Sequence, residues 1–172
     1  MLLEGIMGYP FSCPDMIGGG QFTSFLDDAP IDQELVVRST QVHALMPMMQ
    51  FSVAPWRILD KRHFIAVLDA VNLRNKFKET ILNLAKKASI NGEPIVRSME
   101  YVYPHKGYVD ITDQFMLGNN ILIAPFLSKG EGTRKVILPK GKWKSDAGKV
   151  YNGGKSITIN VPLTRLPYFI KE

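Results

Sequence analysis

One carboxylate, Asp15, lies in the stretch of the chain that is best suited to bind a ligand. Residues 8–20 around it carry prolines at positions 10 and 14 and glycines at positions 18, 19 and 20. Proline fixes φ and removes an amide donor, and glycine allows backbone conformations that are costly for other residues. Residues 1–30 as a whole are rich in Gly, Pro and aromatic residues, which predicts a short strand, not a helix, that opens into a long functional loop. An ionised carboxylate there can accept hydrogen bonds from ligand hydroxyl groups; alternatively, Asp15 caps a helix or closes a turn.

The other reactive side chains favour structural roles. Cys13 has no neighbouring His or Lys that would lower the pKa of its thiol, so we expect a buried structural cysteine. The three histidines, at positions 43, 63 and 105, share no metal-ligand spacing. Residues 152–156 resemble the end of a phosphate-binding loop, but Lys149 stands where that motif needs glycine, so a turn is favoured. No metal and no cofactor is expected.

Length and composition limit the class of protein. A chain of 172 residues has room for one domain or for pieces of two. With 45% hydrophobic and 22% charged residues it can bury a core, which excludes general disorder. The longest apolar runs, such as residues 121–127, are far shorter than the roughly 20 residues of a transmembrane helix, so no membrane partner is expected. No signal peptide is visible at the start, and the sequence predicts no particular compartment.

The positive charge is concentrated in the last third of the chain. Residues 1–110 carry 11 Lys and Arg against 12 Asp and Glu, and residues 111–172 carry 10 against 4, which together give the net charge of +5. The lysines of the second part stand singly among glycine, proline and alternating apolar residues. Exposed strands and turns protect their edges in this way, so nucleic acid is not expected as a partner.

Hydrophobic periodicity then predicts the elements that carry these residues. From residue 32 the apolar positions recur at helical spacing, with Asp28 or Asp32 as the cap and Pro47 at the end. Residues 48–54 suit a short buried strand. Residues 60–89 form the clearest helical stretch, with a break near Asn72, and Asn91-Gly92 ends it.

Beyond residue 92 the period falls to two, which predicts strands. These cover residues 94–103, 120–127, 134–138 and 156–161, with a turn at 140–143 and a hairpin at 151–154. The first 110 residues thus alternate strand and helix, and the last 60 are all-β. The expected fold class is α/β plus β, with a domain boundary near Tyr108.

Four motifs together resemble one known family, glycoside hydrolase family 31. Residues 14–20, P-D-M-I-G-G-G, are similar to its D-I-G-G-F loop, and residues 31–47 are similar to the helix that follows, E-L-Y-x-R-W-x-Q-x-x-A-F-x-P. Residues 94–104 match P-[IV]-x-R-P-L-x-x-x-x-P, and residues 112–125, T-D-Q-F-M-L-G-N-N-I-L-I-A-P, match D-x-Q-F-M-L-G-x-x-L-L-V-A-P. The motifs occur in the family's order over nearly the whole chain.

The resemblance implies a fold of two parts. Residues 1–108 would form the last βα units of a (β/α)8 catalytic barrel, and residues 109–172 would form part of the antiparallel β-sandwich that follows. A complete barrel needs about 250 residues and builds its active site from the loops of many strands. The chain is therefore expected to be a C-terminal fragment, which needs the remainder of the barrel or another chain as a partner.

The resemblance also implies a function, the hydrolysis of α-glycosides with retention. The substrates would be α-glucosides, α-xylosides or α-galactosides. The nucleophile and the acid/base of the family would both precede Met1, so no catalytic residue is expected in this chain, and we expect it to be inactive alone. The alternative is a non-catalytic carbohydrate-binding or structural module.

Three residues are expected to bind the carbohydrate. The resemblance assigns Asp15 to the sugar subsite where cleavage occurs. It places Ser52 near the position of a histidine that many members carry in the sequence R-N-H, so the subsite or the substrate should differ. Trp56 is expected either to stack on a sugar ring or to pack in the core.

Overall fold

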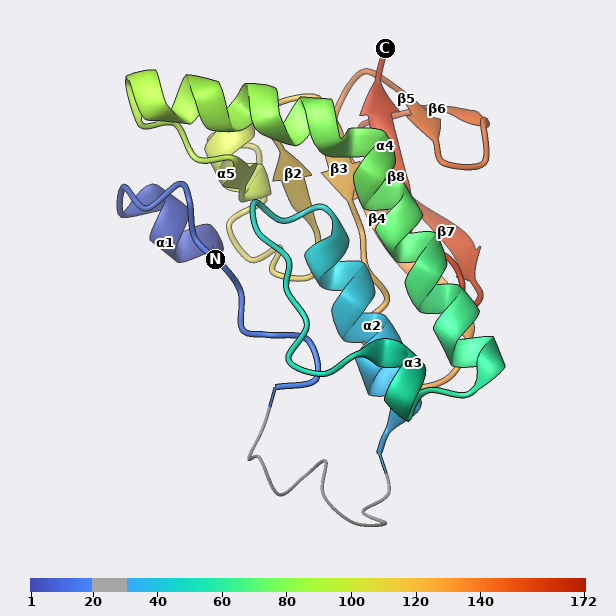
Figure 1. The fold of residues 1–172 in the computed structure, drawn as a ribbon. Helices are drawn as coiled ribbons and strands as arrows, with labels where there is room; N and C mark the ends of the chain where they lie inside the picture. The colour runs from blue at the N-terminus through green and yellow to red at the C-terminus, as the bar shows by residue number, and fades with distance from the viewer. Residues whose placement is uncertain (20–30) are drawn as a thin grey trace.

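The computed structural model describes residues 1–19 and 31–172 of the chain. The elements labelled in Figure 1 follow in chain order: α1 (Leu2–Ile6), α2 (Gln33–Ala44), α3 (Pro55–Ile58), α4 (Lys61–Asn91), β1 (Val96–Arg97), α5 (Met99–Val102), β2 (Phe115–Leu117), β3 (Ile121–Ile123), β4 (Gly132–Leu138), β5 (Lys142–Ser145), β6 (Val150–Asn152), β7 (Lys155–Val161) and β8 (Tyr168–Lys171). Among the helices described, none is both long and apolar enough to cross a membrane.

Two antiparallel sheets make up the C-terminal part. One has six strands in the order β1-β2-β3-β8-β5-β6, and the other consists of β4 and β7. Successive residues of a strand point to opposite faces of its sheet. In β3, for example, Leu122 packs among residues of both sheets, whereas Ile121 and Ile123 face the opposite side. The six-stranded sheet therefore has two buried faces, and each needs its own covering layer.

The two-stranded sheet covers one face. Val136 and Leu138 of β4 pack with Trp143 and Leu122 of the larger sheet in one fully buried cluster. The indole N–H of Trp143 donates to the Pro139 carbonyl oxygen at 2.8 Å, so its one polar atom is satisfied inside the core. The Gln114 side chain also bridges the sheets, because its amide donates to and accepts from the Ile137 backbone at 2.8 and 3.0 Å.

Helix α4 covers the other face. Phe77, Ile81 and Ala88 pack on the strand residues that point away from the smaller sheet, and Phe77 meets Tyr168 edge to face with ring centroids 5.2 Å apart. The first half of α4 packs instead against α2, through Ala66 and Val67. Figure 1 shows that the helix bends between these two halves. The result is three layers: helices, six strands and two strands.

Arg74 fixes the end of α2 to α4. Its guanidinium donates to the carbonyl oxygens of Ala44, Met46 and Pro47 at 3.1, 2.8 and 3.0 Å. The last carbonyls of a helix have no partner within the helix, so these bonds satisfy groups that would otherwise lack one. Arg74 thereby also fixes the direction in which the chain leaves α2 toward residue 50.

The helical predictions are confirmed in position. Asp32 caps α2, accepting from the Leu35 amide at 3.2 Å, whereas Asp28, the other expected cap, lies outside the described residues. Gly92 ends α4 with φ of 72°, a left-handed conformation that suits glycine. The break expected near Asn72 is wrong, because α4 runs without interruption through that residue.

Five local predictions are also wrong. Residues 48–54 do not form a buried strand, because only Phe51 makes a β-bridge and none of these residues is buried. Residues 2–6 form a helix instead of a strand, and residues 94–103 contain only the short β1 before Ser98 caps α5 by accepting from the Tyr101 amide. The turn expected at 140–143 includes the start of β5, in which Trp143 is buried. Residues 151–154 do not form a hairpin, because β6 pairs with β5 and β7 pairs with β4.

The buried position of Leu122 generates the first prediction. Leu122→Ala removes a side chain with no exposed surface from the centre of the two-sheet core, so the free energy of unfolding should fall by about 2–5 kcal/mol. Denaturant titration followed by the fluorescence of the buried Trp143 measures this loss. Val150→Ala, on the exposed part of β6, is the matched control and should change stability by less than about 0.5 kcal/mol. Equal losses in both variants would contradict the described core.

Candidate functional site

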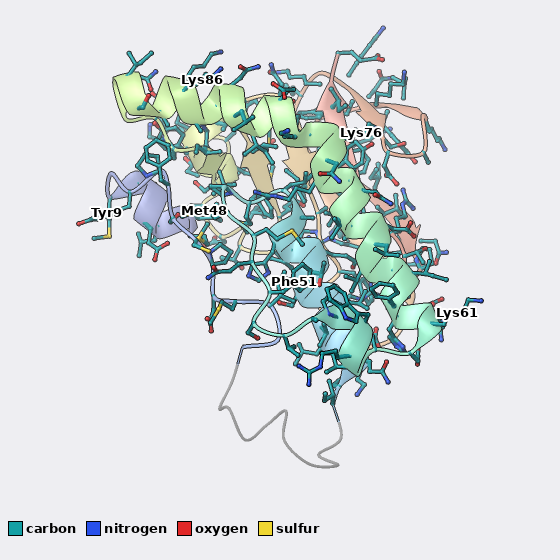
Figure 2. All side chains as sticks on the ribbon, viewed as in Figure 1. Tyr9, Met48, Phe51, Lys61, Lys76 and Lys86 are labelled. Carbon is teal, nitrogen blue, oxygen red and sulfur yellow. The ribbon has the colours of Figure 1, made fainter. Side chains whose placement is uncertain are left out.

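A parallel bridge brings together the two segments that carry predicted site residues. Ile17 pairs with Phe51, which is labelled in Figure 2, and the Ile17 amide donates to the Gln50 carbonyl at 2.9 Å. The Ser52 amide in turn donates to the Ile17 carbonyl at 3.0 Å. Helix α2 lies between the two segments in sequence, and this one bridge pairs them. The residues flanking this bridge are the candidate sugar site.

Asp15 lies two residues before the bridged Ile17, and its side chain is exposed. Its Oδ1 accepts a hydrogen bond from the Met16 amide at 2.8 Å. The Gly19 amide donates to the Met16 carbonyl at 2.8 Å, so the chain turns back beside the carboxylate. A Cβ on Gly19 would lie 2.8 Å from that carbonyl oxygen and 3.5 Å from Asp15 Oδ2. Glycine at this position therefore permits the turn and leaves the carboxylate accessible.

Ser52 and Trp56 follow the second segment. The Ser52 hydroxyl donates to the Ile17 carbonyl oxygen at 3.2 Å, which leaves its lone pairs free to accept. Trp56 lies on α3 and is 71% exposed, so it does not pack in the core that the described residues form. Asp15 and Ser52 are thus joined through the backbone of Ile17, while Trp56 offers an open aromatic surface.

The remaining reactive side chains do not form a second site. Cys13 is half-buried, not buried as expected. His43 on α2 bonds the Ser39 carbonyl through Nδ1 at 2.6 Å, and His63 pairs with its helix cap Asp60 at 2.9 Å. Within residues 1–19 and 31–172, no group of three or more His, Cys, Asp or Glu side chains is arranged to hold a metal ion.

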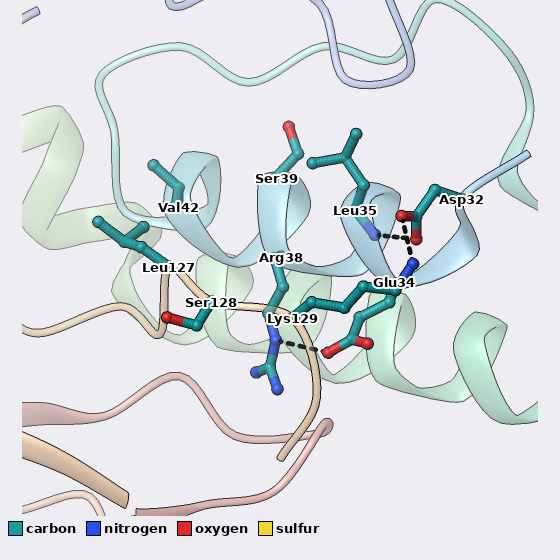
Figure 3. Close-up of a pocket in the computed structure, with 9 residues that line it drawn as sticks. All are labelled: Asp32, Glu34, Leu35, Arg38, Ser39, Val42, Leu127, Ser128 and Lys129. Carbon is teal, nitrogen blue, oxygen red and sulfur yellow. Dashed lines mark hydrogen bonds and ion pairs between the residues drawn. The ribbon is translucent and has the colours of Figure 1, made fainter. Parts of the chain in front are cut away.

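A pocket of about 240 Å³ lies between α2 and residues 127–129 (Figure 3). Leu35, Val42 and Leu127 line its apolar part, and two ion pairs border it. Lys129 bonds Asp32 at 2.9 Å, and together with the capping bond from Leu35 it holds the pKa of the Asp32 carboxyl below its usual range. Because that pKa is lowered, the stabilisation from this pair is present above the ordinary pKa and is lost as pH falls through the lowered one.

Arg38 is the centre of the second ion pair. It is only 6% exposed, and it donates to Gln41 Oε1 and to the Gly130 carbonyl, both at 3.0 Å. Glu34 lies 3.5 Å from Arg38 Nε and accepts from the Gly130 amide at 2.8 Å. Burial lowers the pKa of the Arg38 guanidinium, and Glu34 opposes this shift. We call Arg38, Glu34, Gln41 and the Gly130 backbone the Arg38 network.

The Arg38 network is a structural joint. The guanidinium stacks over the Phe126 ring at 4.8 Å, and Gln41 donates to the Leu163 carbonyl oxygen at 2.6 Å. Helix α2 is therefore tied to the segment that enters β4 and to the segment that leaves β7, which lie at the same end of the smaller sheet. Arg38 and Gln41 stand at the R and Q positions of the helix motif in residues 31–47, and in the sequence only the spacing of Glu34 and Arg38, four residues apart, indicates an ion pair.

Comparison with known proteins gives one family consistently. Residues 92–172 match the model of the glycosyl hydrolase family 31 C-terminal domain. The chain is 35% identical to the myogenesis-regulating glycosidase of Mus musculus over 98% of its length, 30% identical to the SITS-binding protein of Tetronarce californica over 100%, and 33% identical to an alpha-glucosidase of Saccharolobus solfataricus over 97%. It spans about a quarter of each of these relatives, namely 25%, 25% and 24%.

Solved structures agree over the whole chain. A family 31 alpha-xylosidase from a soil metagenome, complexed with xylose, superposes with a TM-score of 0.87 at 26% identity, over 99% of this chain and 29% of that one. A Flavobacterium johnsoniae family 31 dextranase, complexed with isomaltotriose, superposes with a TM-score of 0.85 at 29% identity, over 99% and 22%.

The Arg38 network generates the second prediction. Arg38→Ala leaves Glu34 and the Gly130 carbonyl without their buried partner, so it should lower the free energy of unfolding by about 3–5 kcal/mol. Arg62→Ala is the matched control, because Arg62 pairs with Glu131 at 2.6 Å on the exposed surface and should contribute at most about 1 kcal/mol. Denaturant titration measures the free energy of unfolding of both variants. If Arg38→Ala lowers it no more than Arg62→Ala does, the Arg38 network is not the structural joint described here.

Proposed function

The chain belongs to glycoside hydrolase family 31, and on that premise we propose that it supplies part of the sugar-binding site of a retaining α-glycoside hydrolase. The parallel bridge between Ile17 and Phe51, with α2 between its two segments, is the observation that supports this most directly. Parallel strands joined by a helix are the repeating unit of a (β/α)8 barrel. In the proposal, residues 1–108 belong to that barrel and residues 109–172 to the β-sandwich.

The proposal gives each site residue a distinct role. The exposed carboxylate of Asp15 accepts hydrogen bonds from sugar hydroxyls, each charge-assisted and worth about 1.5–3 kcal/mol. Ser52 offers a short hydroxyl near the same strand ends, and Trp56 offers a ring on which a sugar can stack. Ser52 in place of a longer histidine favours a substrate other than plain α-glucosides.

Catalysis needs two carboxyl groups, and we propose that both lie outside this chain. Retaining hydrolysis uses two carboxyl groups about 5–5.5 Å apart, one as nucleophile and one as acid/base. The family motifs that would carry them have no counterpart in residues 1–172. The chain then binds the substrate, while the catalytic pair comes from other strands of the barrel.

The surface around α1 supports the need for a partner. Leu3, Met7 and Tyr9 are each about two-thirds exposed, and Figure 2 shows Tyr9 and Met48 on the side of the molecule where α1 lies. Apolar side chains gathered on one side are typical of surfaces that another part of a protein covers. We propose that the remainder of the barrel, or another chain, covers them.

A second candidate is a non-catalytic carbohydrate-binding or structural module. It is favoured by one observation, that a relative matched over the whole chain carries a name that describes binding, the SITS-binding protein. The two candidates differ in whether the natural protein turns over an α-glycoside, which the following experiments measure.

The isolated chain of residues 1–172 should cleave no aryl α-glycoside above background, because neither nucleophile nor general acid is proposed in it. Release of the aryl group is the measurement. Turnover that disappears when a carboxylate within residues 1–172 is replaced would show that the chain carries its own catalytic group.

We call the full-length protein, of which residues 1–172 are proposed to be a part, the natural protein. Asp15→Asn in the natural protein should lower kcat/KM by about 10–1000-fold, because the shape of the side chain is kept while one or two charge-assisted hydrogen bonds to the sugar are lost. Asp69→Asn, on the exposed face of α4, is the matched control and should leave kcat/KM unchanged. Azide should not restore the activity of the Asp15 variant. Rescue by azide, with a glycosyl azide of inverted configuration as product, would instead make Asp15 the nucleophile.

A further inference from the structure

Two adjoining hollows form a groove at the β1 edge of the six-stranded sheet, and none of the predicted sugar-site residues lines it. Both are lined by Glu93, Arg97, Asn119 and Asn120, and their volumes are about 400 and 370 Å³. Volumes of a few hundred Å³ are typical of small-molecule sites. We call this feature the edge groove. Its residues come from the end of α4, β1, α5, the β2–β3 turn and β8, so folding brings together segments that are far apart in sequence.

Arg97 forms the rigid floor of the edge groove. Its Nε donates to the Pro94 carbonyl at 2.8 Å, one terminal nitrogen donates to Asn119 Oδ1 at 2.5 Å, and the other lies 3.2 Å from Glu93 Oε2. Its side chain is only 11% exposed. Each of the three guanidinium nitrogens already has a partner. We therefore expect Arg97 to hold the groove in shape and not to contact the ligand itself.

The ion pair of Arg97 and Glu93 also orients Tyr101, whose ring forms one wall of the edge groove. The Tyr101 hydroxyl donates to Glu93 Oε2 at 2.9 Å, and the Arg97 guanidinium lies over the Tyr101 ring, 5.6 Å from its centroid. Tyr101 is nevertheless 39% exposed. Because Glu93 and Arg97 already hold the Tyr101 ring in place, little conformational entropy is lost when a ligand packs on its exposed part. Burial and the bond to Glu93 also raise the pKa of its phenol, so the hydroxyl stays neutral.

Several polar groups that line the edge groove have donors or acceptors that are free to bond a ligand. Among the described residues, no hydrogen bond is recorded for the Asn120 side chain or for the amide nitrogen of Asn119, and both residues are exposed. The Lys171 ammonium has one long bond, 3.3 Å to the Tyr103 hydroxyl. Amides and a phenol can both donate and accept, whereas the ammonium only donates.

We propose that the edge groove binds a neutral oligosaccharide, as a second carbohydrate site distinct from the Asp15 segment. A sugar unit presents hydroxyls that donate and accept, together with an apolar C–H face. The Asn119 and Asn120 amides and Lys171 match the hydroxyls, and the open side of Tyr101 matches the apolar face. The inference rests on the groove's own chemistry and holds whether or not the Asp15 segment belongs to a catalytic site.

Other ligand classes fit the edge groove less well. An anion would meet the ammonium groups of Lys87 and Lys171, but it would also lie beside the Glu93 carboxylate, and the buried Arg97 is already neutralised by that residue. A hydrophobic peptide would find only Leu84 and Val102 as aliphatic wall residues. A neutral polar ligand avoids both costs.

Affinity electrophoresis of the natural protein tests the proposal. Native gels containing soluble starch, dextran or xylan should retard the protein in at least one case. Tyr101→Ala and Asn120→Ala should each weaken that association by about tenfold or more, because each removes a packing surface or a hydrogen-bonding group. Asn120 is an exposed turn residue, so its variant decides the question even if Tyr101→Ala fails to fold.

Two controls separate the edge groove from other surfaces. Tyr9→Ala removes a tyrosine that is more exposed than Tyr101 from the α1 side and should keep full retardation. Asp69→Asn, on the exposed face of α4, should also keep it. The groove variants are judged by retardation and the Asp15 variant by kcat/KM, so a failed catalytic proposal and a failed groove proposal give different results. The proposal is overturned if none of the three neutral polysaccharides retards the protein, if the groove variants are retarded as strongly as the wild type, or if only a heparin gel retards it.

Discussion

The buried guanidinium of Arg38 is the contact that ties helix α2 to the chain leading into the two-stranded sheet. It donates to the Gly130 carbonyl oxygen and stacks on Phe126, and its bond to Gln41 on the same helix orients the side chain for these contacts. Glu34 neutralises the charge and accepts from the same loop. A buried charge is tolerable only when such partners are in place, so the loss of one partner should destabilise the whole joint.

The segments that carry the candidate sugar site depend on this joint indirectly. The Arg38 network holds α2, Arg74 holds the end of α2 on α4, and the chain then reaches Gln50 and the single bridge to Ile17. Asp15 and Ser52 therefore belong to segments with few contacts of their own within this chain. A binding site needs close control of geometry, which is why the proposal assigns the missing support to further strands of a barrel.

The sequence predicted the long, regular elements and missed the short ones. Helices α2 and α4 and strands β4 and β7 were placed correctly, because each is long enough for periodicity and capping to be read. Trp143 was assigned to a turn, since the flanking lysines and Gly141 resemble turn chemistry, yet its pairing with β8 makes it a core strand residue. The Arg38 network could not be predicted, because its main partner lies 92 residues further along the chain. Motif resemblance singled out Asp15 and Ser52, but only the fold places them beside one bridge.

Hydrogen exchange measures the central claim most directly, namely that residues 9–19 and 48–54 need support from outside this chain. Amide exchange should be compared between the isolated chain of residues 1–172 and the natural protein. We predict slow exchange in β2, β3, β5 and β8 in both, because these strands lie in the buried sheet. Residues 9–19 and 48–54 should exchange fast in the isolated chain and slowly in the natural protein. Equal protection of these two segments in both samples would contradict the account.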